Sequence, residues 1–235
     1  MLRLDKFLCE MNIGSRSQVK LYLKHGLVTV NGEVITKPET KVNEHKDEVS
    51  FRGEPFRYRR HVYYMLNKPK DVVSATKDNV SATVTDLLKD TGYPDLFPVG
   101  RLDKDTEGLL LMTNDGALAH DLLSPKKHVK KVYFVILEHP LTEEDVRLLE
   151  AGVDIGEEEL TRPASVELLP DKCIYLTITE GKFHQVKRMI NAVDNNVLYL
   201  KRVSMGSLRL DEELKPGEYR ELTEEEIQGL KQKSI

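Results

Sequence analysis

The charge of this chain changes sign along its length, which favours two separately folded modules over a single one. Residues 1–60 carry 12 Lys and Arg against 8 Asp and Glu, whereas residues 61–235 carry 23 against 31. A basic segment joined to an acidic one is typical of distinct modules. Gly53 and Pro55 interrupt the pattern near the join, and four basic or imidazole side chains follow. We therefore expect a first domain over residues 1–56, a linker over 57–61 and a second domain over 62–235.

The composition excludes several classes of protein. With 40% hydrophobic residues, the chain has enough apolar material for a sizeable core. No apolar run approaches the roughly 18 residues that cross a bilayer. The N-terminal segment mixes charges with apolar side chains, unlike a signal peptide. Cys9 and Cys173 are too few for a disulfide framework or a cysteine-rich zinc site. These features predict a soluble protein of the reducing cytoplasm.

The basic module has the pattern of two helices, a hairpin and a further strand. Apolar residues at helical spacing predict a short amphipathic helix that ends at residues 12–14. Ser15 is the predicted N-cap of a second helix over residues 16–24, which Gly26 ends. Asn31 and Gly32 supply the positive φ angles of a tight turn between strands at residues 27–30 and 33–35. A last strand is expected at residues 47–51.

Basic residues recur every four positions along the second predicted helix. Arg16, Lys20 and Lys24 share one helix face and can follow a phosphate backbone, although such a row is also typical of a solvated face. The order of elements resembles the small RNA-binding module named after ribosomal protein S-four. The resemblance covers residues 1–51, through Leu4-Asp5-Lys6, Gly14-Ser15-Arg16-Ser17, Gly26-Leu27-Val28 and Val30-Asn31-Gly32. It implies contacts with structured RNA from Arg3, Lys6, Arg16, Ser17 and Lys20.

The acidic module opens with a buried-strand pattern at residues 62–68, which Pro69 stops, and a short helix is expected at residues 84–89. A core strand is predicted over residues 109–113, ending in a turn at residues 114–116. Four acidic residues lie within thirteen positions around this strand: Asp103, Asp105, Glu107 and Asp115. Their concentration in an apolar neighbourhood calls for an explanation.

Four explanations of this acidic cluster can be weighed from residue types alone. An aspartyl-phosphate phosphohydrolase loop needs a continuous apolar strand before its first Asp, and Pro98, Gly100 and Arg101 interrupt it. A calcium loop lacks its ligands from Gly108 onward. A glycosidase with paired carboxylates stays open. So does a purely structural role, in which the acids cap turns and pair with Arg101 and Lys104, as a single Asp in a loop usually does.

A longer pattern in the acidic module resembles one family of enzymes. Residues 100–109, Gly-Arg-Leu-Asp-Lys-Asp-Thr-Glu-Gly-Leu, resemble the catalytic motif of uridine-to-pseudouridine isomerases, in their ribosomal small-subunit branch. The resemblance extends from about residue 63 to residue 228 and keeps its order. It includes Lys131-Val132-Tyr133, Glu180-Gly181-Lys182-Phe183-His184-Gln185-Val186-Lys187-Arg188-Met189, Leu200-Lys201-Arg202-Val203-Ser204-Met205-Gly206 and Leu214-Lys215-Pro216-Gly217-Glu218-Tyr219-Arg220.

This resemblance implies an isomerisation that needs no cofactor. The bond between ribose and uracil N1 breaks, the base turns, and it rejoins ribose through C5. Asp103 would be the nucleophile, attacking either the sugar or the base. Lys187 would be its cationic partner, where many relatives place Arg; alternatively, Lys187 and Arg188 contact phosphate. Tyr133 would stack on the base and receive the C5 proton, and Leu200 would pack against the base, although both residues also suit plain strand positions.

Further expectations concern the RNA around the target uridine, which must be flipped out of its stack to be reached. Arg101 is expected to fill the vacated place in the stack, with a salt bridge to Asp105 as the alternative. The basic segment over residues 126–131 is expected to contact phosphate. His120, His128 and His184 lack the spacing of a zinc site, so no metal is expected. Direct RNA contacts are also expected from His184, Gln185 and Arg188.

Together these patterns predict an α+β protein. A small helix–helix–hairpin RNA-binding domain precedes a pseudouridine synthase domain, built on a mixed, mostly antiparallel sheet with flanking helices. The expected function is pseudouridine formation at a specific uridine of ribosomal RNA, in a small-subunit assembly intermediate, by a monomer that contacts no membrane. The same chemistry on large-subunit RNA stays open, as does a non-catalytic RNA-binding assembly factor. Asp103 argues against the latter, because a binder gains nothing from a carboxylate that faces phosphates.

Overall fold

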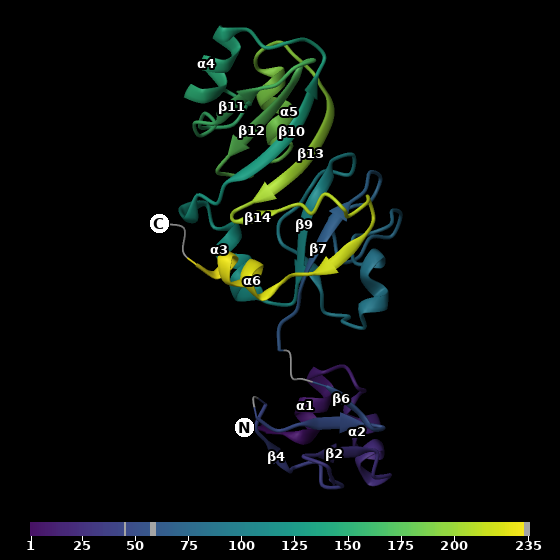
Figure 1. The fold of residues 1–235 in the computed structure, drawn as a ribbon. Coiled ribbons are helices and arrows are strands. Elements are labelled where there is room, and N and C mark those ends of the chain that lie inside the picture. The colour runs from purple at the N-terminus through teal and green to yellow at the C-terminus, as the bar shows by residue number, and fades with distance from the viewer. Residues whose placement is uncertain (45, 57–59, 233–235) are drawn as a thin grey trace. The chain divides into compact units, whose positions relative to one another are not determined.

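Two compact units make up the chain, Met1–Val62 and Tyr63–Ile235. Figure 1 shows the computed structural model, which describes residues 1–44, 46–56 and 60–232. The expected linker over residues 57–61 includes residues 57–59, which lie outside the described residues. Within the described ranges, no helix is both long enough and apolar enough to cross a membrane.

The N-terminal unit contains the two helices and the hairpin that the sequence predicts. Its helices are α1 (Leu4–Glu10) and α2 (Arg16–Lys24). A four-stranded sheet has the order β3-β2-β5-β6, and a second, two-stranded sheet pairs β1 with β4. The strands are β1 (Leu2–Arg3), β2 (Val28–Val30), β3 (Glu33–Val34), β4 (Lys41–Val42), β5 (Val49–Phe51) and β6 (Glu54–Phe56).

Local chemistry sets the ends of these elements. Ser15 caps α2 in a complete capping box with Gln18, and Asn12 ends the preceding helix region with a φ of 55°. Asn31 and Gly32 have φ angles of 51° and 83°, as a type I′ hairpin turn requires. The apolar faces of both helices pack with β2, β4 and β5 in one core cluster, while the basic residues of α2 stay exposed.

The C-terminal unit is built on one large sheet. Its strands are β7 (Tyr63–Lys68), β8 (Phe97–Pro98), β9 (Glu107–Thr113), β10 (Lys131–Leu137), β11 (Ser165–Leu168), β12 (Cys173–Ile178), β13 (Val197–Met205), β14 (Leu208–Arg209) and β15 (Tyr219–Glu221). Its α-helices are α3 (Gly116–Leu123), α4 (Glu143–Ala151), α5 (Gln185–Asn191) and α6 (Glu224–Lys231). Two 3-10 helices are also present, η1 (Asp86–Thr91) and η2 (Pro125–Lys127).

The strand order is β11-β12-β10-β13-β9-β7-β15, with β14 paired to β13 and β8 to β9. Every described pairing in this sheet is antiparallel except that of β13 with β9, where Arg202 lies beside Gly108. The α+β class and the mixed, mostly antiparallel sheet are thus confirmed. This parallel pair is the seam between β11-β12-β10-β13 on one side of the sheet and β9-β7-β15 on the other.

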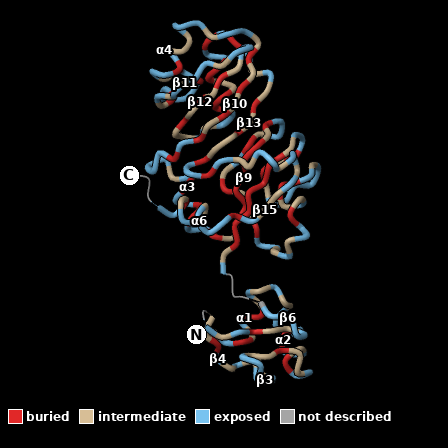
Figure 2. The backbone as a smooth tube through the Cα atoms, viewed as in Figure 1, coloured by how far each residue is buried: buried red, intermediate tan, exposed pale blue. Residues whose placement is uncertain are grey.

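The core gathers along the middle strands. Figure 2 shows β9 buried along nearly its whole length, and all six residues of β7 are buried. Helices α3 and α6 pack against this region through Leu118, Leu122 and Leu230. The short helix expected at residues 84–89 appears as the 3-10 helix η1, shifted toward the C-terminus.

Residues 114–116, predicted as a turn that ends a strand, also begin helix α3. The Asp115 side chain accepts hydrogen bonds from the backbone N–H groups of Ala117 and Leu118, so it is the N-cap of α3. The same carboxylate also accepts a hydrogen bond from the Tyr63 hydroxyl, at 2.7 Å. An Asn-Asp-Gly string that closes a strand can therefore also open a helix, and the sequence pattern alone favoured only the turn.

Candidate active site

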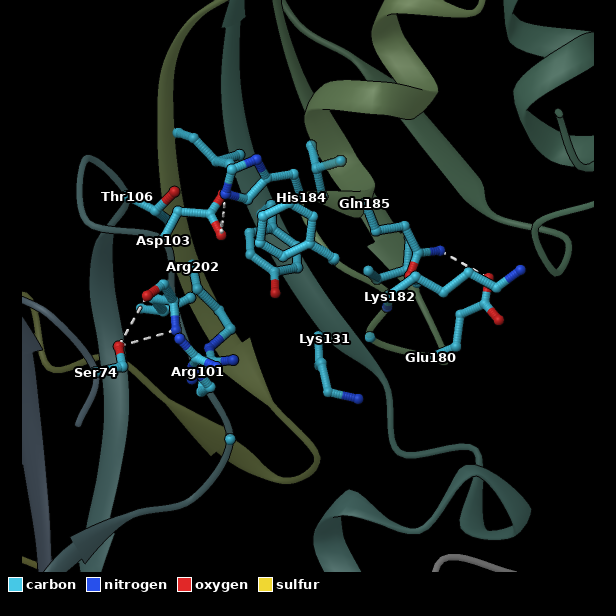
Figure 3. A pocket seen from close by; sticks show the side chains of 18 of the residues that line it. Ser74, Arg101, Asp103, Thr106, Lys131, Glu180, Lys182, His184, Gln185 and Arg202 are labelled. Atoms are coloured by element: carbon cyan, nitrogen blue, oxygen red, sulfur yellow. Dashed lines mark hydrogen bonds and ion pairs between the residues drawn. The ribbon is translucent and has the colours of Figure 1, made fainter. Parts of the chain in front are cut away.

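Asp103 lies in the loop between β8 and β9, and several hydrogen bonds hold this loop in place. The ammonium of Lys68, at the end of β7, donates to the carbonyls of Pro69, Lys104 and Thr106 at 2.9, 3.2 and 2.8 Å. The Ser74 hydroxyl accepts from the Leu102 N–H at 3.0 Å and donates to the Leu102 carbonyl at 2.8 Å. The backbone of the loop is therefore fastened on both sides of Asp103; Figure 3 shows the bonds from Ser74.

Two basic side chains from the start of α5 face the Asp103 carboxylate. His184 Nε2 lies 3.5 Å from Oδ1, and Lys187 Nζ lies 3.4 Å from Oδ2. Lys187 is also 2.6 Å from Asp105 Oδ1, and this bond holds the pKa of Asp105 below its usual value. His184 has a left-handed φ of 48°, and its ring stacks on Phe183 with 3.8 Å between centroids. Lys187 thus lies near Asp103, as expected, but it also forms a shorter ion pair with Asp105.

A cavity of about 600 Å³ opens beside Asp103. Tyr133 on β10 and Leu200 on β13 both line it, together with Asp103 and Arg101. These strands are neighbours, with Val135 opposite Leu200 and Tyr133 opposite Arg202, so their inward side chains form one wall. His184 and Gln185 line it too, so six of the residues singled out from sequence meet at one cavity, although they come from four distant segments of the chain.

Two expected RNA contacts turn out to be engaged within the protein. Gln185 is 4% exposed; its amide donates to Glu180 at 2.7 Å and accepts from the Lys182 N–H at 2.8 Å. Arg188 donates to Glu157 at 2.8 Å and to the carbonyls of Phe183 and Ile155. This geometry favours a role in holding the β12–α5 loop over the direct RNA contact that we expected for both residues.

In the described part of the chain, Asp105 pairs with Lys187 and not with Arg101. Arg101 is exposed at the cavity mouth. In the N-terminal unit, Arg16, Ser17 and Lys20 are exposed on α2. Arg3 pairs with Asp5 at 2.8 Å, and Lys6 lies 3.6 Å from Glu10. The Arg3–Asp5 pair has two hydrogen bonds, whereas the exposed Lys6–Glu10 pair is long and weak.

Sequence reasoning missed three basic residues inside the site. Lys68 is fully buried, which lowers its pKa to about 8. Lys131 and Arg202 are 8% and 2% exposed and line the cavity from β10 and β13. Lys131 was expected to contact phosphate as part of a basic surface segment, and its burial contradicts that. Its position two residues before Tyr133, on the same face of a strand, is a signal that could have revealed it.

The arrangement suits covalent catalysis by a carboxylate. Asp103 lies at the cavity mouth with its side chain 24% exposed, near enough to basic groups to be held in one orientation. The cavity beside it is large enough for a nucleotide base, and an aromatic hydroxyl lies on its wall. Among the described residues, no group of three or more His, Cys, Asp or Glu side chains could hold a metal ion.

Comparison with known proteins agrees with this geometry. Residues 62–192 match the family model described as RNA pseudouridylate synthase, and residues 2–49 match the S4 domain. The chain is 53% identical to the uncharacterized RNA pseudouridine synthase YtzG of Bacillus subtilis, covering 96% of this chain and 97% of that one. It is 41% identical to ribosomal small subunit pseudouridine synthase A of Escherichia coli, with 96% and 98% covered.

A solved structure leads to the same family. A crystal structure of a pseudouridylate synthase superposes with a TM-score of 0.69 at 39% identity, covering 98% of this chain and all of that one. The matched region includes the Asp103 loop, β10 with Tyr133 and the start of α5 with Lys187. The chain therefore belongs to the RNA pseudouridylate synthase family and carries an S4 domain at its N-terminal end.

Proposed function

We propose that this enzyme converts a specific uridine of small-subunit ribosomal RNA into pseudouridine. One observation carries the chemical part: the Asp103 carboxylate lies within 3.5 Å of two basic side chains, beside a cavity that Tyr133 and Leu200 line. The substrate part is supported by the relative of 41% identity that is named for the ribosomal small subunit.

In this proposal Asp103 is the nucleophile and Lys187 its positioning cation. The carboxylate forms a bond to ribose C1′ or to uracil C6, and the C1′–N1 bond breaks with its electron pair left on the base. The base turns, C5 bonds to C1′, and Asp103 leaves again as a carboxylate. The Tyr133 hydroxyl then relays the proton away from C5 while N1 takes up a proton, so that the product is an isomer of uridine. Leu200 packs against the ring. His184 orients Asp103 from the side opposite Lys187.

The RNA outside the cavity is bound by basic side chains of both units. We propose that residues 1–56 form the RNA-binding domain, with Arg3, Lys6, Arg16, Ser17 and Lys20 on phosphate, and that residues 62–235 form the catalytic domain. Arg101, exposed at the cavity mouth, fills the place that the flipped uridine leaves. The enzyme would act as a monomer in the cytoplasm, on an assembly intermediate of the small subunit.

The test uses protein-free small-subunit precursor RNA and, in parallel, the RNA within assembly intermediates. After incubation with the full chain, pseudouridine is mapped by carbodiimide treatment and primer extension. We expect one new stop in small-subunit RNA, absent with Asp103→Ala. Asp194→Asn is the matched control, because Asp194 lies in an exposed turn with a φ of 52° that Asn also adopts.

Three outcomes separate the parts of this proposal. A stop that persists with Asp103→Ala would remove Asp103 as nucleophile. A stop confined to large-subunit RNA would overturn the substrate but keep the chemistry. Binding without a stop in either ribosomal RNA would favour a non-catalytic assembly factor.

A further inference from the structure

Two buried cations line the cavity beside Asp103. None of the reaction steps proposed for Asp103, Lys187 and Tyr133 involves them. Arg202 is 2% exposed and Lys131 is 8% exposed, and both line the cavity. They project from β13 and β10, which pair directly, with Lys131 two residues before Tyr133 and Arg202 opposite Tyr133. In Figure 3 both lie in the lower part of the site, with Asp103 and His184 above them. The two cations therefore belong to one part of the cavity wall, beside Tyr133.

Among the described residues, neither cation forms a salt bridge. Arg202 donates from Nε to the Leu109 carbonyl at 2.8 Å, but its Nη2 is buried and has no hydrogen-bond partner there. Lys131 donates to the Val129 carbonyl at 3.1 Å. The nearby acid, Glu180, accepts from Gln185 and from the Arg162 N–H at 2.7 and 2.9 Å, both through Oε1, and it acts on Lys131 only through space. An unpaired buried charge is costly, and a buried donor without a partner adds to that cost.

The two charges also oppose each other. Burial first, and then the charge of Arg202, lower the pKa of Lys131 to about 8, and Glu180 offsets this only in part. A structural role accounts for Arg202 Nε, which ties β13 to β9, but not for Nη2 or for a second cation beside it. Well-packed apolar side chains would be at least as stable in both places. A negative charge in the cavity would compensate both cations.

The depth of the cations indicates which part of a nucleotide they meet. Asp103 must reach the bond between ribose and base, and its side chain is 24% exposed. Lys131 and Arg202 are more deeply buried than that. The part of a flipped nucleotide that extends past Asp103 is the base, because the phosphates continue into the RNA chain outside. A negative charge on the uracil ring is therefore better placed to meet these cations than a phosphate is.

We infer that Lys131 and Arg202 stabilise the negative charge that the uracil ring acquires during the reaction. This inference rests on the proposed function and names a further pair of catalytic groups within it. When the C1′–N1 bond breaks, its electron pair spreads over N1, O2 and O4; if Asp103 adds to C6 instead, the C5–C6 pair moves onto O4. Both routes place charge on the carbonyl oxygens, where preorganised cations in a water-poor site are most effective. When the C5–C1′ bond forms, the electron pair enters that bond, the carbonyl oxygens lose their negative charge, and the cations no longer face an anion.

The test compares two substrates that differ in how well the base carries negative charge by itself. One is a short RNA with uridine at the mapped position, and the other has 5-fluorouridine there, since fluorine withdraws electrons from the ring. Single-turnover loss of the original nucleoside is followed at saturating RNA by nuclease digestion and mass spectrometry. RNA affinity is measured separately by filter binding.

For Lys131→Gln we expect a rate roughly 10²-fold lower on uridine RNA, by analogy with the loss of an oxyanion donor. The loss should be smaller on 5-fluorouridine RNA, the affinity should be unchanged, and Lys131→Arg should recover most of the rate. Arg202→Lys keeps the charge but removes Nη2. It should likewise lose more of its rate on uridine RNA than on 5-fluorouridine RNA. Lys201→Gln is the matched control, because Lys201 neighbours Arg202 on β13 but lines a different cavity.

Equal losses on both substrates would overturn the inference in favour of a structural role. A weaker affinity with an unchanged rate would overturn it in favour of a phosphate site. Circular dichroism and thermal melting identify any variant that fails to fold. If Lys131→Gln is one of these, the rates of Lys131→Arg and Arg202→Lys on the two substrates test the inference instead. If the unaltered enzyme converts neither RNA, the proposed function itself fails, and the inference fails with it.

Discussion

Lys187 is placed between two carboxylates rather than on one. Its ammonium lies closer to Asp105, at 2.6 Å, than to Asp103, at 3.4 Å, and Asp105 is the more exposed of the two acids. An exposed partner is screened by water, whereas the half-buried Asp103 depends more on a fixed cation. A lysine serves both acids as a point charge, where an arginine would present a planar fork. The charge of this residue therefore matters more than its shape.

Two substitutions of Lys187 distinguish the effect of its charge from the effect of its shape. We expect Lys187→Met to lower the single-turnover rate by roughly 10²-fold, and Lys187→Arg to stay within about tenfold of the original rate. The measurement is pseudouridine formation at saturating RNA. A Lys187→Met variant with an unchanged rate but weaker RNA binding would instead show that Lys187 contacts phosphate.

At the scale of elements, Gly108 and Lys68 determine how the strands around the cavity are held together. Gly108 has a φ of 103°, and a Cβ at this position would lie 2.3 Å from the Arg202 carbonyl oxygen. The parallel seam between β9 and β13 therefore depends on a missing side chain. Lys68 forms a second connection, because its ammonium joins the end of β7 to the loop of Asp103.

Gly108→Ala should open this seam. Backbone strain and the clash with β13 together should lower the free energy of unfolding by roughly 2–4 kcal/mol, measured by urea titration. Activity should fall too, since Arg202 and Leu200 lie on the displaced strand. Gly116→Ala is the control: nothing lies within 4 Å of a Cβ there, and the change should be within about 1 kcal/mol and stabilising. A similar loss in both variants would contradict the role of the seam.

Lys68 should make stability depend on pH in a predictable direction. Its pKa is lowered from 10.5 to about 8 by burial, so between these values the unfolded chain binds more protons than the folded one. The free energy of unfolding contributed by Lys68 should therefore rise with pH across this window, by up to about 3 kcal/mol.

The measurement for Lys68 is the difference between the original chain and Lys68→Met, from urea titrations at pH 7.5 to 10.5. Burial and acidic partners raise the pKa of Tyr63 and Tyr199, which lowers stability at the alkaline end, but both chains share this effect. A difference that stays flat or falls with pH would show that Lys68 titrates normally.

How much of this could be predicted depends on how local the determining contacts are. Helix α2 was predicted to the residue, because Ser15, Gln18 and Gly26 set both of its ends. Asp103, Tyr133 and Lys187 were found through motifs, but their approach depends on strand pairing between distant segments. The burial of Lys131 and Arg202 was missed for the same reason: pattern alone assigns a cation to the surface, and only the pairing of β10 with β13 places these two inside.

At the scale of the whole molecule, charge is distributed by module. The chain carries a formal net charge of −4, which taken alone would argue against an RNA enzyme. The first 60 residues nevertheless carry +4, and Arg16, Lys20 and Lys24 lie exposed along one helix. We therefore expect the position of the cations, and not their total number, to govern RNA binding.

Two variants of equal net charge test this claim. The first changes the helix row, Arg16→Gln, Lys20→Gln and Lys24→Gln; the second changes three exposed lysines of the same unit outside the helices, Lys37→Gln, Lys41→Gln and Lys46→Gln. If the row follows the phosphate backbone, the first variant should reduce the slope of log affinity against log salt by about 2–3, because each phosphate contact contributes roughly 0.7–0.9. The second should reduce it far less, and neither should change the single-turnover rate at saturating RNA. Equal slopes in the two variants would show that net charge alone attracts the RNA.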